Sequence, residues 1–90
     1  MIKICEYRGH IVNWRNLCDE LGISRELSRE EREIEILVHG YEKWRHDIGE
    51  HLYGMFAFCL HDDSNDEIFC IRDHFGTKPF YYYVTNDNQL

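Results

Sequence analysis

Residues 55–60, Met-Phe-Ala-Phe-Cys-Leu, form the first of three short apolar runs in the last third of the chain. The other two are Ile-Phe-Cys-Ile at residues 68–71 and Phe-Tyr-Tyr-Tyr-Val at residues 80–84, and polar turns separate the three runs. Short runs that are apolar at every position predict strands that are covered on both faces. The fold is therefore expected to place covering layers on both sides of one sheet.

The residues before these runs predict one short strand and a first helix. Residues 2–5 indicate a strand that runs into a turn at residues 8–10. The first helix is expected to begin at a cap residue, Asn13, and to end at Gly22. Its apolar stripe consists of Trp14, Leu17, Cys18 and Leu21.

A second helix is marked more clearly. Ser28 and Glu31 form a capping box, and the helix is expected to run to about Trp44. Its apolar side chains recur at the spacing i, i+3, i+4 and i+7, at Ile34, Leu37, Val38 and Tyr41. A short amphipathic segment at residues 48–52 follows and is stopped by Gly54.

The composition fits one small domain. The chain has 90 residues, of which 43% are apolar, and a formal charge of −7. We predict a single α+β domain over residues 1–90, with two main helices on a mostly antiparallel sheet. Residues 46–90 contain two Lys/Arg against eight Asp/Glu, which argues against nucleic-acid binding. Because no apolar run approaches the roughly 18 residues of a membrane helix, we expect no membrane partner and a cytoplasmic chain.

No metal site and no cofactor are predicted. The four cysteines lie at positions 5, 18, 59 and 70, without a C-x-x-C pair, and we expect reduced, buried thiols rather than a disulfide framework or a zinc site. The six histidines show no metal-binding spacing. Asp62, Ser64 and Asp66 resemble the first ligands of a calcium loop. Glu67 stands where such a loop needs glycine, so a polar turn is favoured.

Three longer segments carry a family resemblance. They read Gly-Tyr-Glu-Lys-Trp at residues 40–44, His-Leu-Tyr-Gly-Met-Phe-Ala-Phe at 51–58, and Arg-Asp-His-Phe-Gly-Thr-Lys-Pro-Phe-Tyr-Tyr-Tyr at 72–83. Together they resemble the glutaminase domain of glutamine-dependent asparagine synthetases, a class II glutamine amidotransferase domain. The resemblance implies a partial α/β/β/α sandwich of the N-terminal-nucleophile type. This chain corresponds to a middle piece of it, and a second sheet would cover the doubly apolar strands.

The resemblance also implies where the chemistry of the family lies. Family members attack the glutamine amide with an N-terminal cysteine and hold the oxyanion at an Asn-Gly turn. Here Met1 begins the chain, Arg8 stands at the Asn of that turn, and Gly9 is kept. His10 replaces the Glu after the turn, and Glu33 replaces the Asp that grips the glutamine α-amine. These four positions resemble a vestigial glutamine pocket, so we assign no catalytic residue and expect an inactive chain with weak or absent glutamine binding.

One further motif, at the turn before the last apolar run, has two interpretations. It consists of Arg72, Asp73, Gly76, Lys78 and Pro79. The first interpretation is a phosphate or substrate loop. The second, which we favour, is a tight structural turn in which Gly76 supplies an unusual backbone angle and Pro79 supplies rigidity. The Ser-Gly-Gly-x-Asp-Ser nucleotide signature of the synthetase half is absent from the chain, so no ATP site is expected.

Two functions fit these features of the sequence. In the first, the chain is a segment of an asparagine-synthetase-type glutamine amidotransferase, whose family activity is glutamine hydrolysis that supplies ammonia for ATP-dependent asparagine formation. In the second, it is a non-catalytic binding or scaffold module derived from that fold. In both, an uncovered sheet face predicts a partner, either a second copy of the chain through self-association or the remainder of the synthetase.

Overall fold

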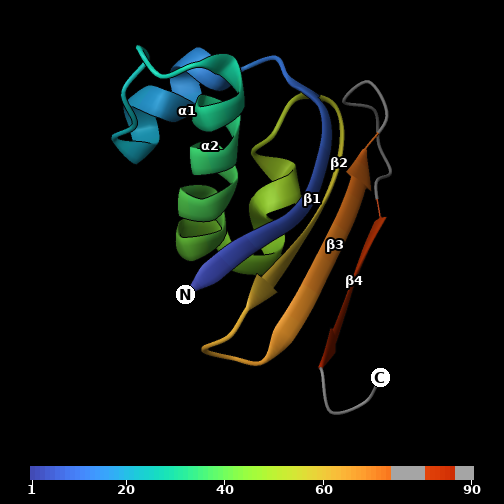
Figure 1. Ribbon diagram of the computed structural model, residues 1–90. Helices are drawn as coiled ribbons and strands as arrows, with labels where there is room; N and C mark the ends of the chain where they lie inside the picture. The colour runs from blue at the N-terminus through green and yellow to red at the C-terminus, as the bar shows by residue number, and fades with distance from the viewer. Residues whose placement is uncertain (74–80, 87–90) are drawn as a thin grey trace.

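The chain folds into a layer of helices on one face of a single antiparallel sheet. The computed structural model describes residues 1–73 and 81–86. In chain order the elements are β1 (Ile2–Ile11), α1 (Trp14–Leu21), α2 (Arg29–Trp44), the 3₁₀ helix η1 (Arg45–Glu50), β2 (Gly54–Asp62), β3 (Glu67–Asp73) and β4 (Tyr81–Asn86). The strands lie in the order β1-β2-β3-β4, and every neighbouring pair is antiparallel. Figure 1 shows the helices gathered on one side of this sheet. The predicted α+β fold, with two main helices on an antiparallel sheet, is confirmed.

The ends of the helices follow the signals in the sequence, with one exception. The Ser28 hydroxyl accepts a hydrogen bond from the Glu31 amide at 3.2 Å, as a capping box requires. Gly22 ends α1 in the left-handed conformation, with φ of 73°. Asn13 is the N-cap residue of α1, as predicted, but its side chain makes no capping hydrogen bond within the helix. Its amide instead donates to the carbonyl of His51 at 3.0 Å and accepts from the amide of Tyr53 at 3.0 Å.

The core lies between the helices and the sheet. On α2 the fully buried apolar side chains are Ile36, Leu37 and Tyr41, while Ile34 and Val38 are only partly buried. The buried stripe is therefore rotated toward Ile36 from the one that the sequence spacing predicts. From the strands, the helix-facing side chains are those of Ile11, Phe56, Phe58, Leu60, Phe69 and Ile71, each no more than 3% exposed.

The first strand is longer than predicted. The sequence indicates a strand over residues 2–5 and a turn at residues 8–10, but β1 continues through that turn to Ile11 and pairs with β2 along its whole length. Gly9 makes this continuation feasible, because it adopts φ of 110° where β1 passes against the backbone of β2. A register shift between Ile4 and Glu6 leaves Cys5 as an extra residue, a β-bulge.

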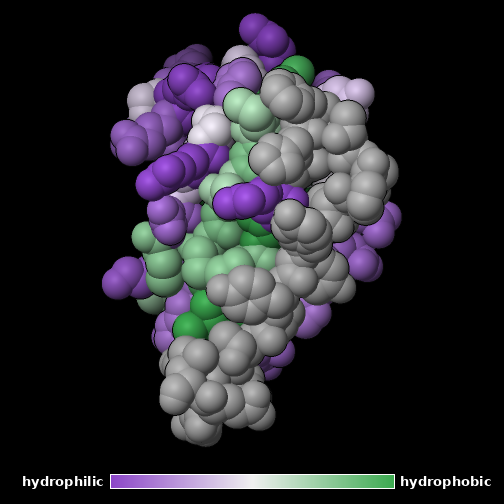
Figure 2. Space-filling model, turned by 90° about the vertical axis from the view of Figure 1, so that its right-hand side faces the viewer, coloured by the Kyte–Doolittle hydropathy of each residue, from purple (hydrophilic) through white to green (hydrophobic). Residues whose placement is uncertain are grey.

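The sheet face opposite the helices is called the outer face here. Register and alternation place ten side chains on it: Lys3, Glu6, Arg8, Met55, Ala57, Cys59, His61, Ile68, Cys70 and Arg72. His10 pairs with Met55 but is an exception to this alternation, because its ring contacts Glu33 on α2. Its centre is apolar and its borders are charged. Figure 2 shows hydrophobic residues gathered in a band at the surface on the side where β4 lies in Figure 1. The described residues thus form two layers, half of the four-layer arrangement that the resemblance implies.

Among the residues that the structure describes, none of the helices combines the length and the apolarity that a bilayer crossing demands.

Candidate functional site

A buried carboxylate on the second turn of α2 organises the candidate site. Glu33 is only 1% exposed. The hydroxyl of Tyr7 donates to its Oε1 at 2.6 Å, and Nδ1 of His10 lies 3.0 Å from its Oε2. The amide of Ile11 donates to the same Oε2 at 3.4 Å. A buried carboxylate is tolerated only where hydrogen bonds and opposite charge replace its hydration, and these donors from β1 fulfil that condition.

Arg29 completes the charge balance of this site from the same helix. Its Nε lies 3.6 Å from Oε2 of Glu33, one helical turn away, and its Nη2 donates to the carbonyl of Gly9 at 3.0 Å. One guanidinium therefore joins the start of α2 to the middle of β1. Burial, and then the hydrogen bond to Glu33, raise the pKa of Tyr7 well above its usual range, so that its hydroxyl stays protonated and keeps donating.

These side chains border a hollow of about 320 Å³ between β1 and α2. Its lining residues are Tyr7, Gly9, Arg29, Glu30 and Glu33. The lining combines one guanidinium with two carboxylates, a charge pattern that suits a small zwitterion. The carboxylate of Glu33, however, already accepts from three donors and faces a cation, so a ligand ammonium group has to displace existing partners.

The structure brings together three of the four residues of the vestigial pocket. Gly9 and Glu33 line the hollow, and His10 contacts Glu33. Arg8 lies on the outer face, where its side chain is 81% exposed and its Nε is 3.5 Å from Oε2 of Glu6. Because successive residues of a strand point to opposite faces, the side chain of Arg8 is directed away from the hollow.

Two members of the cluster, Tyr7 and Arg29, were not among the residues singled out from sequence. The sequence spacing of each residue from a residue of the vestigial pocket could have identified it. Tyr7 precedes Gly9 by two positions, which places both on one face of a strand. Arg29 precedes Glu33 by four positions, which places an oppositely charged pair on one face of a helix.

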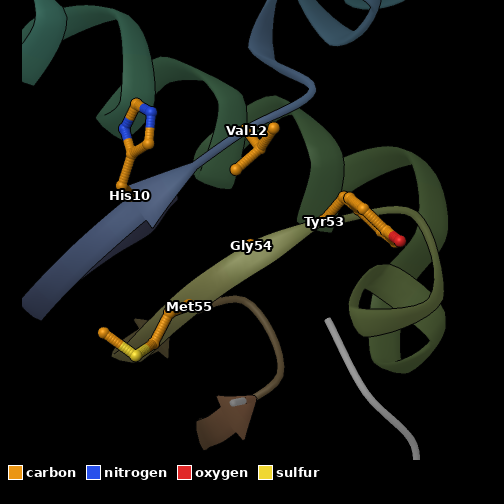
Figure 3. Close-up of a pocket in the computed structure, with 5 residues that line it drawn as sticks. All are labelled: His10, Val12, Tyr53, Gly54 and Met55. Carbon is orange, nitrogen blue, oxygen red and sulfur yellow. The ribbon is translucent and has the colours of Figure 1, made fainter. Parts of the chain in front are cut away.

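A second hollow, of about 280 Å³, lies where β1 and β2 meet (Figure 3). It is lined by His10, Val12, Tyr53, Gly54 and Met55, and its walls are mostly apolar. Val12, Tyr53 and Met55 are three of the large apolar side chains that are most exposed in the described part of the chain, at 56%, 60% and 48%. With His10 as its sole titratable side chain besides the tyrosine hydroxyl, this hollow suits apolar contact rather than catalysis.

The turn between β2 and β3 contains the residues considered for calcium. The carboxylate of Asp62 accepts hydrogen bonds from Asn65 Nδ2 at 2.9 Å, Arg45 Nη1 at 3.0 Å and the Ser64 amide at 3.1 Å. Burial by itself raises the pKa of this carboxyl, but the hydrogen bonds from Asn65, Arg45 and Ser64 outweigh burial, and its pKa lies below the usual range. Asp62 therefore stabilises the turn between β2 and β3 and forms an ion pair with Arg45. Within residues 1–73 and 81–86, no three His, Cys, Asp or Glu side chains are placed to hold a metal ion.

The turn motif is only partly within the described residues. Arg72 lies exposed on the outer face, and the backbone of Asp73 pairs with Phe56 at the end of β3. Gly76, Lys78 and Pro79 lie outside the described residues. The choice between a structural turn and a phosphate loop therefore stays a prediction.

Comparison with known proteins places these features in a family. The model of the glutamine amidotransferase domain matches residues 3–90. The chain is similar to asparagine synthetase [glutamine-hydrolyzing] 3 of Bacillus subtilis, with 36% identity over 76 residues, which are 84% of this chain and 12% of that protein. It is also similar to the putative asparagine synthetase [glutamine-hydrolyzing] 2 of Methanocaldococcus jannaschii, with 36% identity over 80 residues, 89% of this chain and 15% of that protein.

The similarity extends to a vertebrate relative. The asparagine synthetase [glutamine-hydrolyzing] of Gallus gallus is 29% identical over 85 residues, 93% of this chain and 15% of that protein. The chain thus spans only 12–15% of the length of these three relatives. The match of nearly the whole chain to the domain model, together with the helix layer on an antiparallel sheet, shows that the chain belongs to the glutamine amidotransferase domain family, in the form found in asparagine synthetases.

Proposed function

We propose that this chain forms the Gly9–Glu33 side of the glutamine pocket in an asparagine-synthetase-type amidotransferase, and that it does not hydrolyse glutamine by itself. The observation that carries the proposal is the position of the four cysteines. Cys18 is buried in the helix layer, Cys59 and Cys70 lie on the outer face, and Cys5 is exposed on the β-bulge of β1. In the described residues no thiol lines the hollow of Tyr7, Gly9 and Arg29. A nucleophile must converge with the oxyanion donors on one reacting atom.

The orientation of Arg8 supports the same proposal. The resemblance assigns this position to the oxyanion hole, where a donor must point at the developing negative charge. The side chain of Arg8 is instead on the outer face, beside Glu6. The pocket therefore lacks a side-chain donor from this position, which also favours a loss of activity over a change in substrate.

The proposal is tested with the purified chain and two measurements. Ammonia release from glutamine is followed in an assay coupled to glutamate dehydrogenase, and glutamine binding is followed by titration of amide NMR signals. We expect ammonia release equal to the buffer blank, and no saturable shift below millimolar glutamine. Ammonia release that persists through purification and disappears in a Cys59→Ser or a Cys5→Ser variant would show that one of these thiols is catalytic and would overturn the proposal.

The second candidate function is a non-catalytic binding module. The observation that favours it is the closed network around Glu33, in which His10 and Tyr7 occupy the carboxylate that the resemblance assigns to the glutamine α-amine. Such a module would bind a ligand other than glutamine at the hollow. NMR titration with a panel of amino acids and dipeptides distinguishes the two candidates, since shifts at Gly9 and Glu33 with a ligand other than glutamine favour the module. The cytoplasmic location expected from sequence stays a prediction under both.

A further inference from the structure

Two cysteines that are eleven positions apart lie directly opposite each other on neighbouring strands. The register of β2 and β3 pairs Cys59 with Cys70. Residues directly opposite in an antiparallel pair have Cα atoms about 4.5 or 5.5 Å apart, depending on the hydrogen-bonding pattern. Both values lie within the range of about 4.4–6.8 Å that disulfide-bonded cysteines show. The register of β2 and β3 is therefore compatible with a disulfide between these two cysteines.

The side chains agree with the backbone. Both thiols point to the outer face and are partly exposed, and their Sγ atoms are 2.6 Å apart. A disulfide bond is about 2.05 Å long, so bond formation requires the two sulfurs to approach by about half an ångström. The helices cover the other face of the sheet, so a small oxidant reaches the pair from the outer face.

The other two cysteines are placed differently. Cys18 is fully buried in the helix layer, behind the sheet. Cys5 is exposed on the β-bulge of β1, beside the register position of Cys59, and its Sγ contacts the carbonyl of Lys3. Cys5 is therefore the one competing thiol among the four, and Cys18 serves as an internal reference that oxidants do not reach.

We propose that Cys59 and Cys70 are a modification site, a dithiol that small disulfide oxidants convert into a cross-strand disulfide on the outer face. In the first step, the thiolate of one cysteine of the pair attacks one sulfur of oxidised glutathione, which forms a mixed disulfide and releases one glutathione thiolate. In the second step, the other cysteine loses its proton to solvent and attacks the protein sulfur of the mixed disulfide, which forms the Cys59–Cys70 bond and releases the second glutathione. Two protein thiols are oxidised while one glutathione disulfide is reduced to two glutathione molecules.

The environment of Cys59 disfavours the thiolate form of its side chain. Burial, and then the hydrogen bond with Cys70, raise the pKa of the Cys59 thiol to about 12. A thiol that stays protonated at neutral pH is a slow first nucleophile toward a free oxidant. In the mixed disulfide the target sulfur is held beside the remaining thiol of the pair, so that proximity compensates for a small thiolate fraction.

Peptide mapping of the full 90-residue chain tests the proposal. The chain is incubated with oxidised glutathione, blocked with iodoacetamide under denaturing conditions, and cut with trypsin and a Glu-specific protease. Cleavage after Glu50, Glu67 and Arg72 places Cys59 in residues 51–67 and Cys70 in residues 68–72, while Cys5 and Cys18 fall in other fragments. We expect fragments 51–67 and 68–72 to be joined, with two fewer hydrogen atoms than their sum, and the number of titratable thiols to fall from four to two.

Matched variants decide between the possible pairings. Cys5→Ser and Cys18→Ser are expected to leave the linked fragments unchanged, whereas Cys70→Ser and Cys59→Ser should abolish them and leave at most mixed glutathione adducts. Far-UV circular dichroism of each variant shows whether it is folded. A folded wild-type chain that keeps four free thiols at a glutathione concentration that oxidises unfolded chain, or a link between Cys5 and Cys59 as the main product, would overturn the proposal.

Discussion

Glu33 is the residue on which the candidate site depends. Its buried carboxylate accepts from Tyr7, His10 and the Ile11 amide, and it faces the guanidinium of Arg29. Glu33→Ala leaves the Tyr7 hydroxyl and the Ile11 amide without an acceptor, so we expect a loss of about 2–3 kcal/mol in the free energy of unfolding. Glu33→Gln keeps an acceptor oxygen and should cost about 1 kcal/mol.

Urea denaturation followed by circular dichroism measures both losses. Glu30→Gln is the matched control, because Glu30 lies on the same helix and lines the same hollow but is exposed. We expect it to change stability by less than about 0.5 kcal/mol. Equal effects of the Glu33 and Glu30 substitutions would mean that the network around Glu33 contributes nothing to stability.

Gly9 is required by its backbone as well as by its neighbours. Its φ is 110°, and a Cβ there would meet the carbonyl oxygen of Met55 and lie 2.7 Å from the Cα of Phe56. We expect Gly9→Ala to cost at least about 3 kcal/mol, from strain and from displacement of β1. Gly22 also has positive φ but has nothing near its Cβ position, so Gly22→Ala should cost only about 1 kcal/mol. Thermal unfolding compares the two, and similar losses would contradict the close approach of β1 to β2.

Asp62 makes the stability of the folded chain depend on pH in the acid range. Its pKa in the folded chain lies below the ordinary value of 3.8, so its contribution to stability is present above that value and is lost as the pH falls through the folded pKa. We expect Asp62→Asn to be less stable than wild type at pH 7 and the difference to shrink below about pH 4. Urea midpoints at several pH values check this. A difference that is constant from pH 7 to pH 3 would show that the charge of Asp62 is not involved.

At the scale of the element, α2 depends on its N-terminal cap. The Ser28 hydroxyl accepts from the Glu31 amide and lies 3.2 Å from the Glu31 carboxylate. Ser28→Ala removes this cap and should cost about 1 kcal/mol, while Ser28→Asp keeps an acceptor and should be nearly neutral. The free energies of unfolding of the two variants give the answer, and an alanine variant as stable as the aspartate variant would show that the cap is dispensable. Because Arg29 and Glu33 lie in the first two turns after this cap, the cap also fixes the start of the helix that positions both side chains.

The elements were predictable to the extent that their signals are local. The apolar spacing of α2, its capping box and the short apolar runs of β2 and β3 each lie within a few residues, and each element appears where expected. The continuation of β1 to Ile11 was not predictable, because Arg-Gly-His at residues 8–10 has the composition of a turn and pairing with β2 overrides it. The donors to Glu33 come from β1, about 25 positions earlier, so no local pattern shows them together.

At the scale of the whole molecule, the outer face is the surface through which we expect the chain to associate. Its apolar centre includes Met55, which is 48% exposed, and in the described residues no helix covers it. We propose that the isolated chain self-associates through this face to a dimer or a larger assembly. Met55→Glu should shift the chain toward monomer in sedimentation velocity across a range of concentrations.

The control for this shift is a charge placed elsewhere. Asn16→Glu adds the same charge to the exposed side of α1, in the helix layer, so it raises the net negative charge without touching the outer face. We expect this variant to associate like wild type. A wild-type chain that stays monomeric at all concentrations would contradict self-association through the outer face.

The pairing of β1 with β2 also has a consequence for the order of folding. This pair joins residues as far apart as Ile2 and Asp62, whereas β2 and β3 form a hairpin across the few residues between Asp62 and Glu67. Closing the longer loop costs more chain entropy, so the hairpin and the helices are expected to form first and β1 to dock last. Since β1 contributes Tyr7, Gly9 and His10, we expect half of the candidate site to form only when β1 docks, so that a ligand of the hollow stabilises only the completed fold.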